Sequence, residues 1–303
     1  MINFLVSILE QGAIFAIVAL GVYITYKILD FPDMSVDGTF PLGAAVTALC
    51  LSKGINPFIA CLVAVFAGMI GGTVTGLLHV KLKISNLLSG ILVMIGLYSI
   101  NLRIMGKSNI PFFGFNTMFA VTKGIPSVLV IAIIAIVVKL VLDIFMKTKM
   151  GFVLNAVGDN EQLVTSLGIN KDVIKVIGLS ISNGIAALGG SIMAQNQGYA
   201  DVGMGTGTVV IGLAAVILGR SVLKNVKFIK ATTMAVIGAI LYKLAIGVAL
   251  RIGLQPQDLK LVTALIVIAV LGANNFKLSS FRKREKEGDE LVASNTKSVQ
   301  GIQ

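Results

Sequence analysis

The chain has 303 residues, of which 56% are hydrophobic and 13% are charged, and its mean hydropathy is +0.93. This balance excludes an ordinary soluble globular domain and predicts an all-α polytopic membrane protein. The chain has 25 basic residues, 14 acidic residues, two cysteines and one histidine. These leave no disulfide framework, metal cluster or acid–base set for catalysis, so we expect a protein that is not an enzyme.

Membrane spans are predicted from the length of the apolar runs, because a helix needs about 20 such residues to cross a bilayer core of about 30 Å. Two apolar runs, 40–52 and 206–219, are shorter than this and rich in Gly and Ala. They are either re-entrant segments or buried helices that cross without touching lipid. Full-length candidates lie at 3–27, 57–79, 85–105, 124–146, 173–195, 228–250 and 258–276.

The placement of lysine and arginine predicts the topology, because cytoplasmic loops carry an excess of positive charge. If both short runs cross and the N-terminus lies outside, most basic residues fall on the cytoplasmic side. This gives about nine spans, in a range of eight to ten, and a cytoplasmic C-terminus. A rival topology makes 40–52 re-entrant, with eight crossings and a cytoplasmic N-terminus. The basic, polar tail 277–303 is predicted to be disordered in the cytoplasm.

The segment LDFPDMSVDGTF, residues 29–40, places three aspartates between two apolar runs. In the nine-span topology it is a turn at the cytoplasmic end of the first span. Pro32 ends a helix there, and Asp37 with Gly38 suits a turn. We interpret Asp33 as a gate or as an anchor for the following short helix, in preference to a binding site.

A weak internal repeat relates this segment to a later one. The sequence beginning at Ala19 and the sequence beginning at Ala187 each have a helix end with Leu-Gly, a polar stretch, and a short helix ending in Ala-Ala-Val. Asp33 falls on Asp201 in this alignment. Because the first helices of the two segments run in opposite directions in the nine-span topology, the repeat is predicted to be inverted.

The repeat predicts the domain organisation. A permease domain, 1–276, would consist of two four-span halves, about 3–105 and 173–276, with one extra span, 124–146, and a coupling loop, 147–172, between them. Short helices at matching positions of two such halves are typical of a translocation path. The predicted path or gate residues are Asp33, Asp37, Gly38, Asp201, Gly203 and Gly205.

The longest polar segment between spans, KTKMGFVLNAVGDNEQLVTSLGINKD, is predicted to contain a short amphipathic helix. Asn160 can cap its N-terminus and Gly168 can end it in the left-handed conformation. Between them, Leu163, Val164 and Leu167 fall on one face. An apolar face on a protruding helix indicates a partner protein or, alternatively, contact with the membrane surface.

Two motifs in the chain resemble a known family. The loop pattern Met150-Gly151, Asn155 to Asn160 and Ser166 to Asn170 resembles the cytoplasmic loop of ABC importer permeases of the branched-chain amino acid and ribose type. The segment from Asp33 to Val46 is similar to the tryptophan/tyrosine-type branch of these permeases. It departs from the better-known amino acid permeases at its aspartates, which leaves the exact substrate open.

The resemblance implies a bacterial plasma-membrane subunit that dimerises, as a homodimer or a heterodimer. It also implies two cytosolic ATP-binding subunits and an extracytoplasmic binding lipoprotein that delivers a small solute, an amino acid of aromatic type. The chain lacks GxxxxGK[ST], so it has no cofactor of its own and the partner subunits bind ATP. The residues implied in coupling are Gly151, Asn155, Gly158, Asp159, Asn160, Glu161, Leu163, Leu167 and Gly168.

An ion-coupled secondary transporter is the alternative function. It is motivated by Glu10, Lys139, Asp143 and Lys243, because ionisable groups inside a membrane are costly and often functional. Lys139 and Asp143 lie four residues apart and can instead pair on one helix face. The role of Glu10 stays open.

Overall fold

The computed structural model describes residues 2–223 and 229–251, together with a few residues between 261 and 272. The predicted span 258–276 lies largely outside the described residues, and the predicted tail 277–303 lies wholly outside them. The described elements are α1 (Ile2–Val22) with its π-helical continuation η1 (Tyr23–Ile28), α2 (Val36–Ser52), α3 (Pro57–Leu82), α4 (Asn86–Met105), β1 (Asn109–Pro111), α5 (Met118–Val121), α6 (Ser127–Met146), α7 (Lys149–Asp159), α8 (Glu161–Ser166), α9 (Lys171–Gln197), β2 (Tyr199–Asp201), the 3-10 helix η2 (Val202–Gly205), α10 (Thr208–Leu223) and α11 (Ala231–Arg251).

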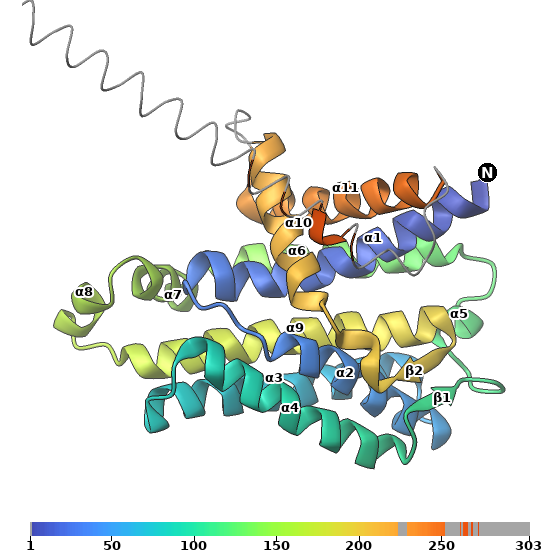
Figure 1. The fold of residues 1–303 in the computed structure, drawn as a ribbon, viewed down its shortest axis with the longest axis horizontal. Helices are drawn as coiled ribbons and strands as arrows, with labels where there is room; N and C mark the ends of the chain where they lie inside the picture. Colours follow the sequence, from blue (N-terminus) through green and yellow to red (C-terminus); the bar gives the residue numbers. More distant parts are fainter. Residues whose placement is uncertain are drawn as a thin grey trace, which may run out of the picture.

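The long helices share one axis, which runs horizontally in Figure 1, and α10 is inclined to it. At one end, called the α8 end here, α7 and α8 protrude; at the other, called the β1 end, β1 pairs with β2 in an antiparallel two-stranded sheet. In the described part, seven helical segments are long and apolar enough to cross a membrane. Six of them coincide with the stretches predicted above, and the seventh, Val202–Leu223, contains the short run 206–219.

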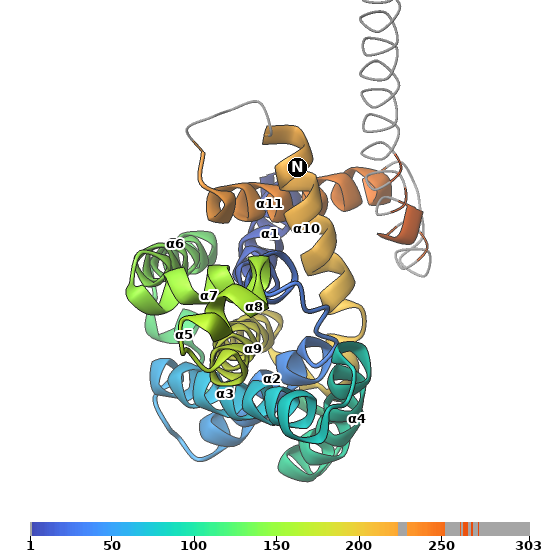
Figure 2. The same cartoon turned by 90° about the vertical axis from the view of Figure 1, so that its left-hand side faces the viewer.

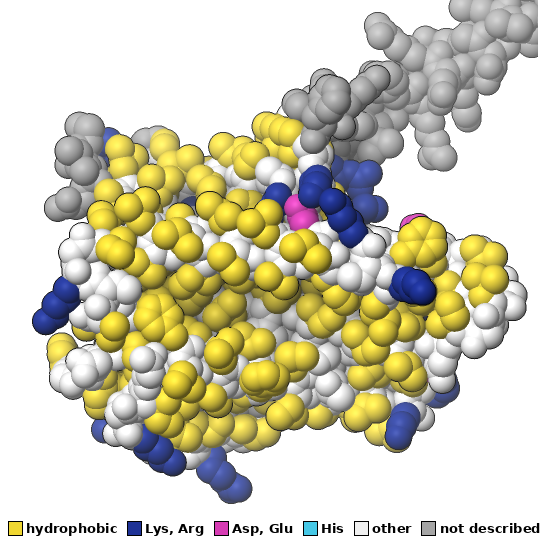
Figure 3. All heavy atoms as spheres, turned by 180° about the vertical axis from the view of Figure 1, so that it is seen from behind, with side chains coloured by type: hydrophobic (Ala, Val, Ile, Leu, Met, Phe, Trp, Pro, Cys, Tyr) yellow, Lys and Arg dark blue, Asp and Glu magenta, His cyan; other side chains and the backbone are white. Residues whose placement is uncertain are grey.

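The outer surface of the bundle is apolar along the spans. Phe66 and Ile70 on α3 are 64% and 66% exposed, and Ile133 and Ile144 on α6 are 59% and 65% exposed. Figure 3 shows hydrophobic side chains covering much of one face, with most of its basic side chains toward the edges. Such a surface is stable against lipid chains, which confirms the assignment as an integral membrane protein.

Helix α2 is short but is buried on nearly all sides. Its 17 residues extend about 25 Å at 1.5 Å per residue. It packs against α3, α4 and α9, as Figure 2 shows along the helix axes. The structure therefore favours a buried helix for the run 40–52, the second of the two alternatives given above.

Glycines allow α2 and α9 to touch backbone to backbone. A Cβ atom at Gly43 of α2 would overlap the carbonyl oxygen of Ala187, and a Cβ at Gly190 of α9 would overlap that of Phe40. Without a hydrophobic force between helices in lipid, such close packing is what holds them together.

Helices from the early part of the chain pack on a helix of the later part, and the converse also holds. Helices α2 and α3 pack on α9, while α10 and α11 pack on α1. Helices α1 and α9 contact each other at the centre and run in opposite directions (Figure 1).

Candidate functional site

The α8 end carries a small helical knob formed by α7 and α8. Asn160 caps α8, because its Oδ1 accepts hydrogen bonds from the backbone N–H of Gln162 and of Leu163, both at 3.0 Å. Gly168 follows the helix with a φ of +76°. The predicted short helix, its cap and its left-handed end are therefore confirmed.

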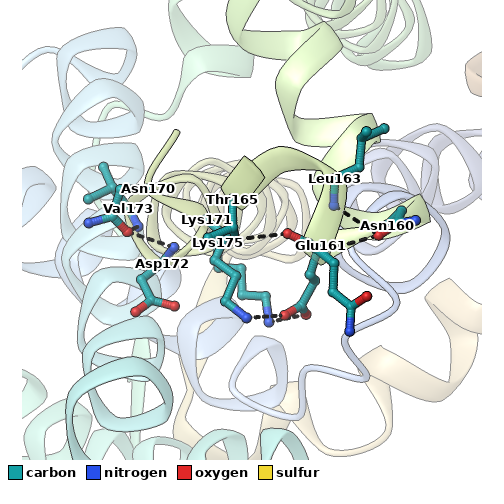
Figure 4. A network of polar contacts seen from close by, with 10 residues as sticks. Asn160, Glu161, Leu163, Thr165, Asn170, Lys171, Asp172, Val173 and Lys175 are labelled. Carbon is teal, nitrogen blue, oxygen red and sulfur yellow. Dashed lines mark hydrogen bonds and ion pairs between the residues drawn. The ribbon is translucent and has the colours of Figure 1, made fainter. Parts of the chain in front are cut away.

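The knob is tied to the start of α9 by ion pairs (Figure 4). The Glu161 carboxylate accepts a hydrogen bond from Lys171 Nζ at 2.8 Å and also pairs with Lys175. Asn170 caps α9 by accepting the backbone N–H of Asp172 at 3.0 Å. These contacts hold α8 at a fixed angle to the longest helix of the described part. The role of Lys171 and Lys175 was not predicted from the sequence. The available signal was Glu161, which lies ten residues before Lys171 on the other side of the turn at Gly168.

We expect the knob to loosen at acid pH. Hydrogen bonds from Lys171 and Lys175 lower the pKa of the Glu161 carboxyl from its usual value of 4.5. Because the folded-state pKa is the lower one, the pairs stabilise the knob above the usual pKa and lose this effect as the pH falls through the lowered pKa. Amide hydrogen exchange in α8, compared between the wild type and Glu161→Gln at each pH, should differ at neutral pH and converge in acid. If the difference in exchange were the same at all pH values, the ion pairs of Glu161 would not stabilise α8.

The apolar face predicted for α8 is divided by the structure. Val164 is buried with 1% exposure, whereas Leu163 and Leu167 are 56% and 69% exposed. Val164 packs inward with the residues between α7 and α9, and only the two leucines remain for a partner. Phe152 on α7, which the sequence analysis did not select, is 74% exposed. It lines a groove of about 520 Å³ together with Val164 and Leu167.

Helix α7 itself was not predicted, and it explains the two glycines of the loop motif. A Cβ at Gly151 would overlap the carbonyl oxygen of Phe145, and one at Gly158 would overlap that of Ile28. Both glycines therefore face the bundle and serve packing, not the exposed surface. Asn155 lies within α7 and donates to the carbonyl oxygen of Gly151 at 3.2 Å, and Asp159 ends α7 in an exposed position.

Asp33 is the centre of a buried polar network that joins the start of α2 to α9. Its Oδ1 accepts the backbone N–H of Ser35 at 2.9 Å and the Ser35 hydroxyl at 2.5 Å. Its Oδ2 accepts Asn183 Nδ2 at 2.7 Å, and Asn183 Oδ1 accepts the Thr39 hydroxyl at 2.7 Å. Asp33 is only 3% exposed, so this geometry supports an anchor over a binding site.

Asp37 joins α2 to a helix from the other end of the sequence. Its two carboxylate oxygens accept the backbone N–H groups of Gly207 at 2.8 Å and of Val209 at 2.7 Å. Asp37 thus caps the N-terminus of α10, which begins at Thr208. Gly205 lets this contact form, because a Cβ there would overlap the carbonyl oxygen of Asp37.

Asp201 lies at the β1 end and shares no hydrogen-bond partner with Asp33. It accepts the backbone N–H of Gly203 at 2.7 Å and caps η2, and its Oδ2 accepts Asn109 Nδ2 at 3.2 Å. Like Asp33 with Ser35, it therefore binds the N–H two residues further on.

A pocket of about 390 Å³ brings together three of the predicted path residues. It lies between α2, α4 and η2. Its lining comprises Asp37, Gly38, Pro41, Met94, Ile95, Tyr98, Ser99, Asn101, Val202, Gly203 and Thr206. Sequence reasoning missed the contribution of α4. Asn101, a polar residue in an apolar span, was the available signal.

The four charged groups that motivated the ion-coupled alternative, Glu10, Lys139, Asp143 and Lys243, have local partners. Asp143 pairs with Lys139 at 2.9 Å, as predicted, and also accepts Lys230 Nζ at 2.8 Å. Glu10 accepts a hydrogen bond from Ser127. Lys243 Nζ lies 3.9 Å from the ring centre of Phe15 on α1. No group of three His, Cys, Asp or Glu in the described ranges could hold a metal ion.

Known proteins resemble the chain over almost its whole length. A tyrosine transport system permease protein of Clostridioides difficile (strain R20291) is 51% identical over 276 residues, which cover 91% of this chain and 92% of that protein. The ribose import permease protein RbsC of Escherichia coli (strain K12) is 26% identical, over 91% of this chain and 87% of that protein.

A solved structure shares the fold. It is an inward-facing conformation of a metal-chelate type ABC transporter, with a TM-score of 0.52 and 16% identity over 89% of this chain and 84% of that chain. The sequence profile described as branched-chain amino acid transport system, permease component, matches residues 4–274. The chain therefore belongs to this family of ABC permease components, which makes it a multi-pass membrane transport subunit and not an enzyme.

Proposed function

We propose that the chain is the translocating subunit of an importer for an aromatic amino acid of tyrosine type. The observation that carries this proposal is the 51% identity to a tyrosine transport system permease over 91% of the chain. Membership of the ABC family replaces the secondary transporter alternative, and it implies ATPase partners and no cofactor of the permease's own. A binding lipoprotein would deliver the amino acid from outside, and a second permease copy would complete the membrane unit.

The proposed architecture has nine spans, which are two inverted four-span halves and one further span, α6, between them. The reciprocal packing of α2 and α3 on α9 and of α10 and α11 on α1 supports this arrangement. So do the matching turns at Asp33 and Asp201. In this arrangement α2 and α10 hold equivalent positions beside the path, and the α8 end faces the cytoplasm.

The knob is the proposed docking surface for the ATPase subunits. Leu163, Leu167 and Phe152 are exposed apolar side chains on helices that are fixed to the bundle by caps, ion pairs and glycine contacts. A rigid apolar projection fits into a groove of a partner and excludes water from it. Because the knob is joined directly to α9, force applied to it reaches the helix on which α1, α2 and α3 pack.

Charged substitutions on the knob should strongly reduce its assembly with the ATPase subunits. Leu163→Asp combined with Leu167→Asp places two carboxylates in the docking face, and we expect at least about tenfold less ATPase subunit to copurify, equivalent to about 1.4 kcal/mol or more. Gln162→Asp, on the same exposed helix, is the matched control and should assemble normally. Membrane insertion of all three proteins should be equal. Normal assembly of the double variant would overturn the proposed docking surface.

The substrate is tested on the complete transporter. Proteoliposomes that contain the permease, its ATPase subunits and its binding protein should accumulate labelled tyrosine. ATP is supplied on the side of the membrane where the ATPase subunits lie. Uptake of ribose but not of tyrosine would overturn the proposed substrate class while leaving the family assignment intact. Uptake driven by an ion gradient without ATP would contradict the proposed energy source.

A further inference from the structure

The pocket between α2, α4 and η2 has an unusual polar composition for a site inside an apolar bundle. Asp37 provides a carboxylate, and Asn101 and Thr206 provide an amide and a hydroxyl. Among the residues that the structure describes, no lysine, arginine or histidine lines it. The described lining therefore has a negatively charged acceptor and no positively charged donor. This suits a cationic group and not an anion.

The charge of Asp37 is only partly balanced. Among the described residues Asp37 forms no ion pair, and its partners are backbone N–H groups at the start of α10. The dipole at a helix N-terminus corresponds to about half a positive charge. The negative charge of an ionised Asp37 is thus offset by the helix dipole alone, in a region of low dielectric where it attracts a cation more strongly than in water.

Asn101 supplies a second, independent acceptor. It is fully buried, and its Nδ2 donates to the carbonyl oxygen of Gly38 at 3.2 Å. Its Oδ1 is buried and has no hydrogen-bond partner in the described part of the chain. A buried polar atom without a partner costs free energy unless a ligand supplies the missing donor. Since Gly38 follows Asp37 in α2 and both line the pocket with Asn101, the Asn101 amide lies against the residue next to Asp37.

We propose that this pocket is a transit site that binds the α-ammonium group of the transported amino acid, with Asp37 and Asn101 as its acceptors. The inference rests on the proposed function and names how the path recognises its cargo. An ammonium group has three donors and one positive charge, which match the two unsatisfied features of the site. The apolar lining of Pro41, Met94 and Ile95, with the ring of Tyr98, receives an aromatic side chain.

Ligand analogues test this recognition with Asp37 and Asn101 unchanged. Ser99 lines the pocket and is exposed, while Cys50 and Cys61 are buried. In a Ser99→Cys variant of the assembled transporter, tyrosine and tyramine should slow maleimide labelling at least threefold, because both carry the ammonium group. The deaminated acid 3-(4-hydroxyphenyl)propionate should not. Labelling of Leu88→Cys, on the same helix but outside the pocket, should respond to none of them. Equal protection by all three compounds, or by none, would overturn the proposal.

A second arm uses transport. Asn101→Leu removes the unpaired acceptor at similar volume, and we expect ATP-driven tyrosine uptake to fall at least fivefold while copurification of the ATPase subunits is unchanged. If the wild type takes up tyrosine and Asn101→Leu does so equally well, the transit site is wrong and the proposed function stands. If the wild type takes up no tyrosine, the proposed substrate is wrong. If the variant does not fold, the labelling comparison decides.

Discussion

Replacing Gly43 with alanine should destabilise the permease by about 3 kcal/mol, the upper part of the usual range for overpacking. The added methyl group would overlap the carbonyl oxygen of Ala187. Backbone cannot rotate away as a side chain can, so α2 and α9 must separate, and the contact at Gly190 would be lost with them. The melting temperature of the purified protein in detergent should fall by about 10 °C, at a few degrees per kcal/mol.

Gly96 provides the matched control. It also lies within a helix, α4, but a Cβ there would meet no atom within 4 Å. Gly96→Ala should therefore raise the melting temperature slightly, since alanine favours a helix over glycine by up to about 1 kcal/mol. Equal effects of the two substitutions would show that α2 and α9 do not touch as the structure has them.

Removal of the Asp33 carboxylate should have an effect of similar size. Asp33→Ala leaves the Ser35 N–H and one donor of Asn183 without their acceptor in a buried site, while the Ser35 hydroxyl keeps only its 3.1 Å bond to Asn183 Oδ1. Each buried donor left without a partner costs about 1–3 kcal/mol, so we expect a loss of about 3 kcal/mol or more. The yield of monodisperse protein and its melting temperature measure this loss.

Asp33→Asn distinguishes an anchor from a charge-dependent site. Asparagine keeps the shape and an acceptor for Ser35, and Asn183 can turn its amide to restore a complementary pair. It should retain most of the stability that alanine loses. If both variants are stable but neither supports uptake, Asp33 acts on the substrate and the structural role proposed for it is wrong.

The spans and the short helix α8 could be predicted because their signals are local. Length and apolar character decide a span, and α8 follows from Asn160 at its start and Gly168 at its end. The burial of α2 was also indicated, because a run of 13 residues rich in small side chains, 40–52, cannot cross lipid unaided.

The rest could not be predicted because its partners are distant in the sequence. Helix α7 contains Gly151 and Gly158, which lower its helix propensity, and only their contacts with α6 and η1 explain them. The two N–H groups that Asp37 caps lie 170 and 172 residues further along the chain. Nothing near Asn101 in the sequence shows that its side-chain oxygen is left without a donor.

The ion pairs between α8 and α9 have a mechanical consequence. Helix α9 has 27 residues and is therefore a rod about 40 Å long. A push on the knob that tilts this rod by about 5° about one end carries its other end about 3.5 Å sideways, by the geometry of a helix of that length. That end leads through β2 into η2, and η2 lines the pocket beside α2. A partner at one end of the molecule can thus widen or narrow a space near the other through leverage alone, with no unfolding of any helix between them.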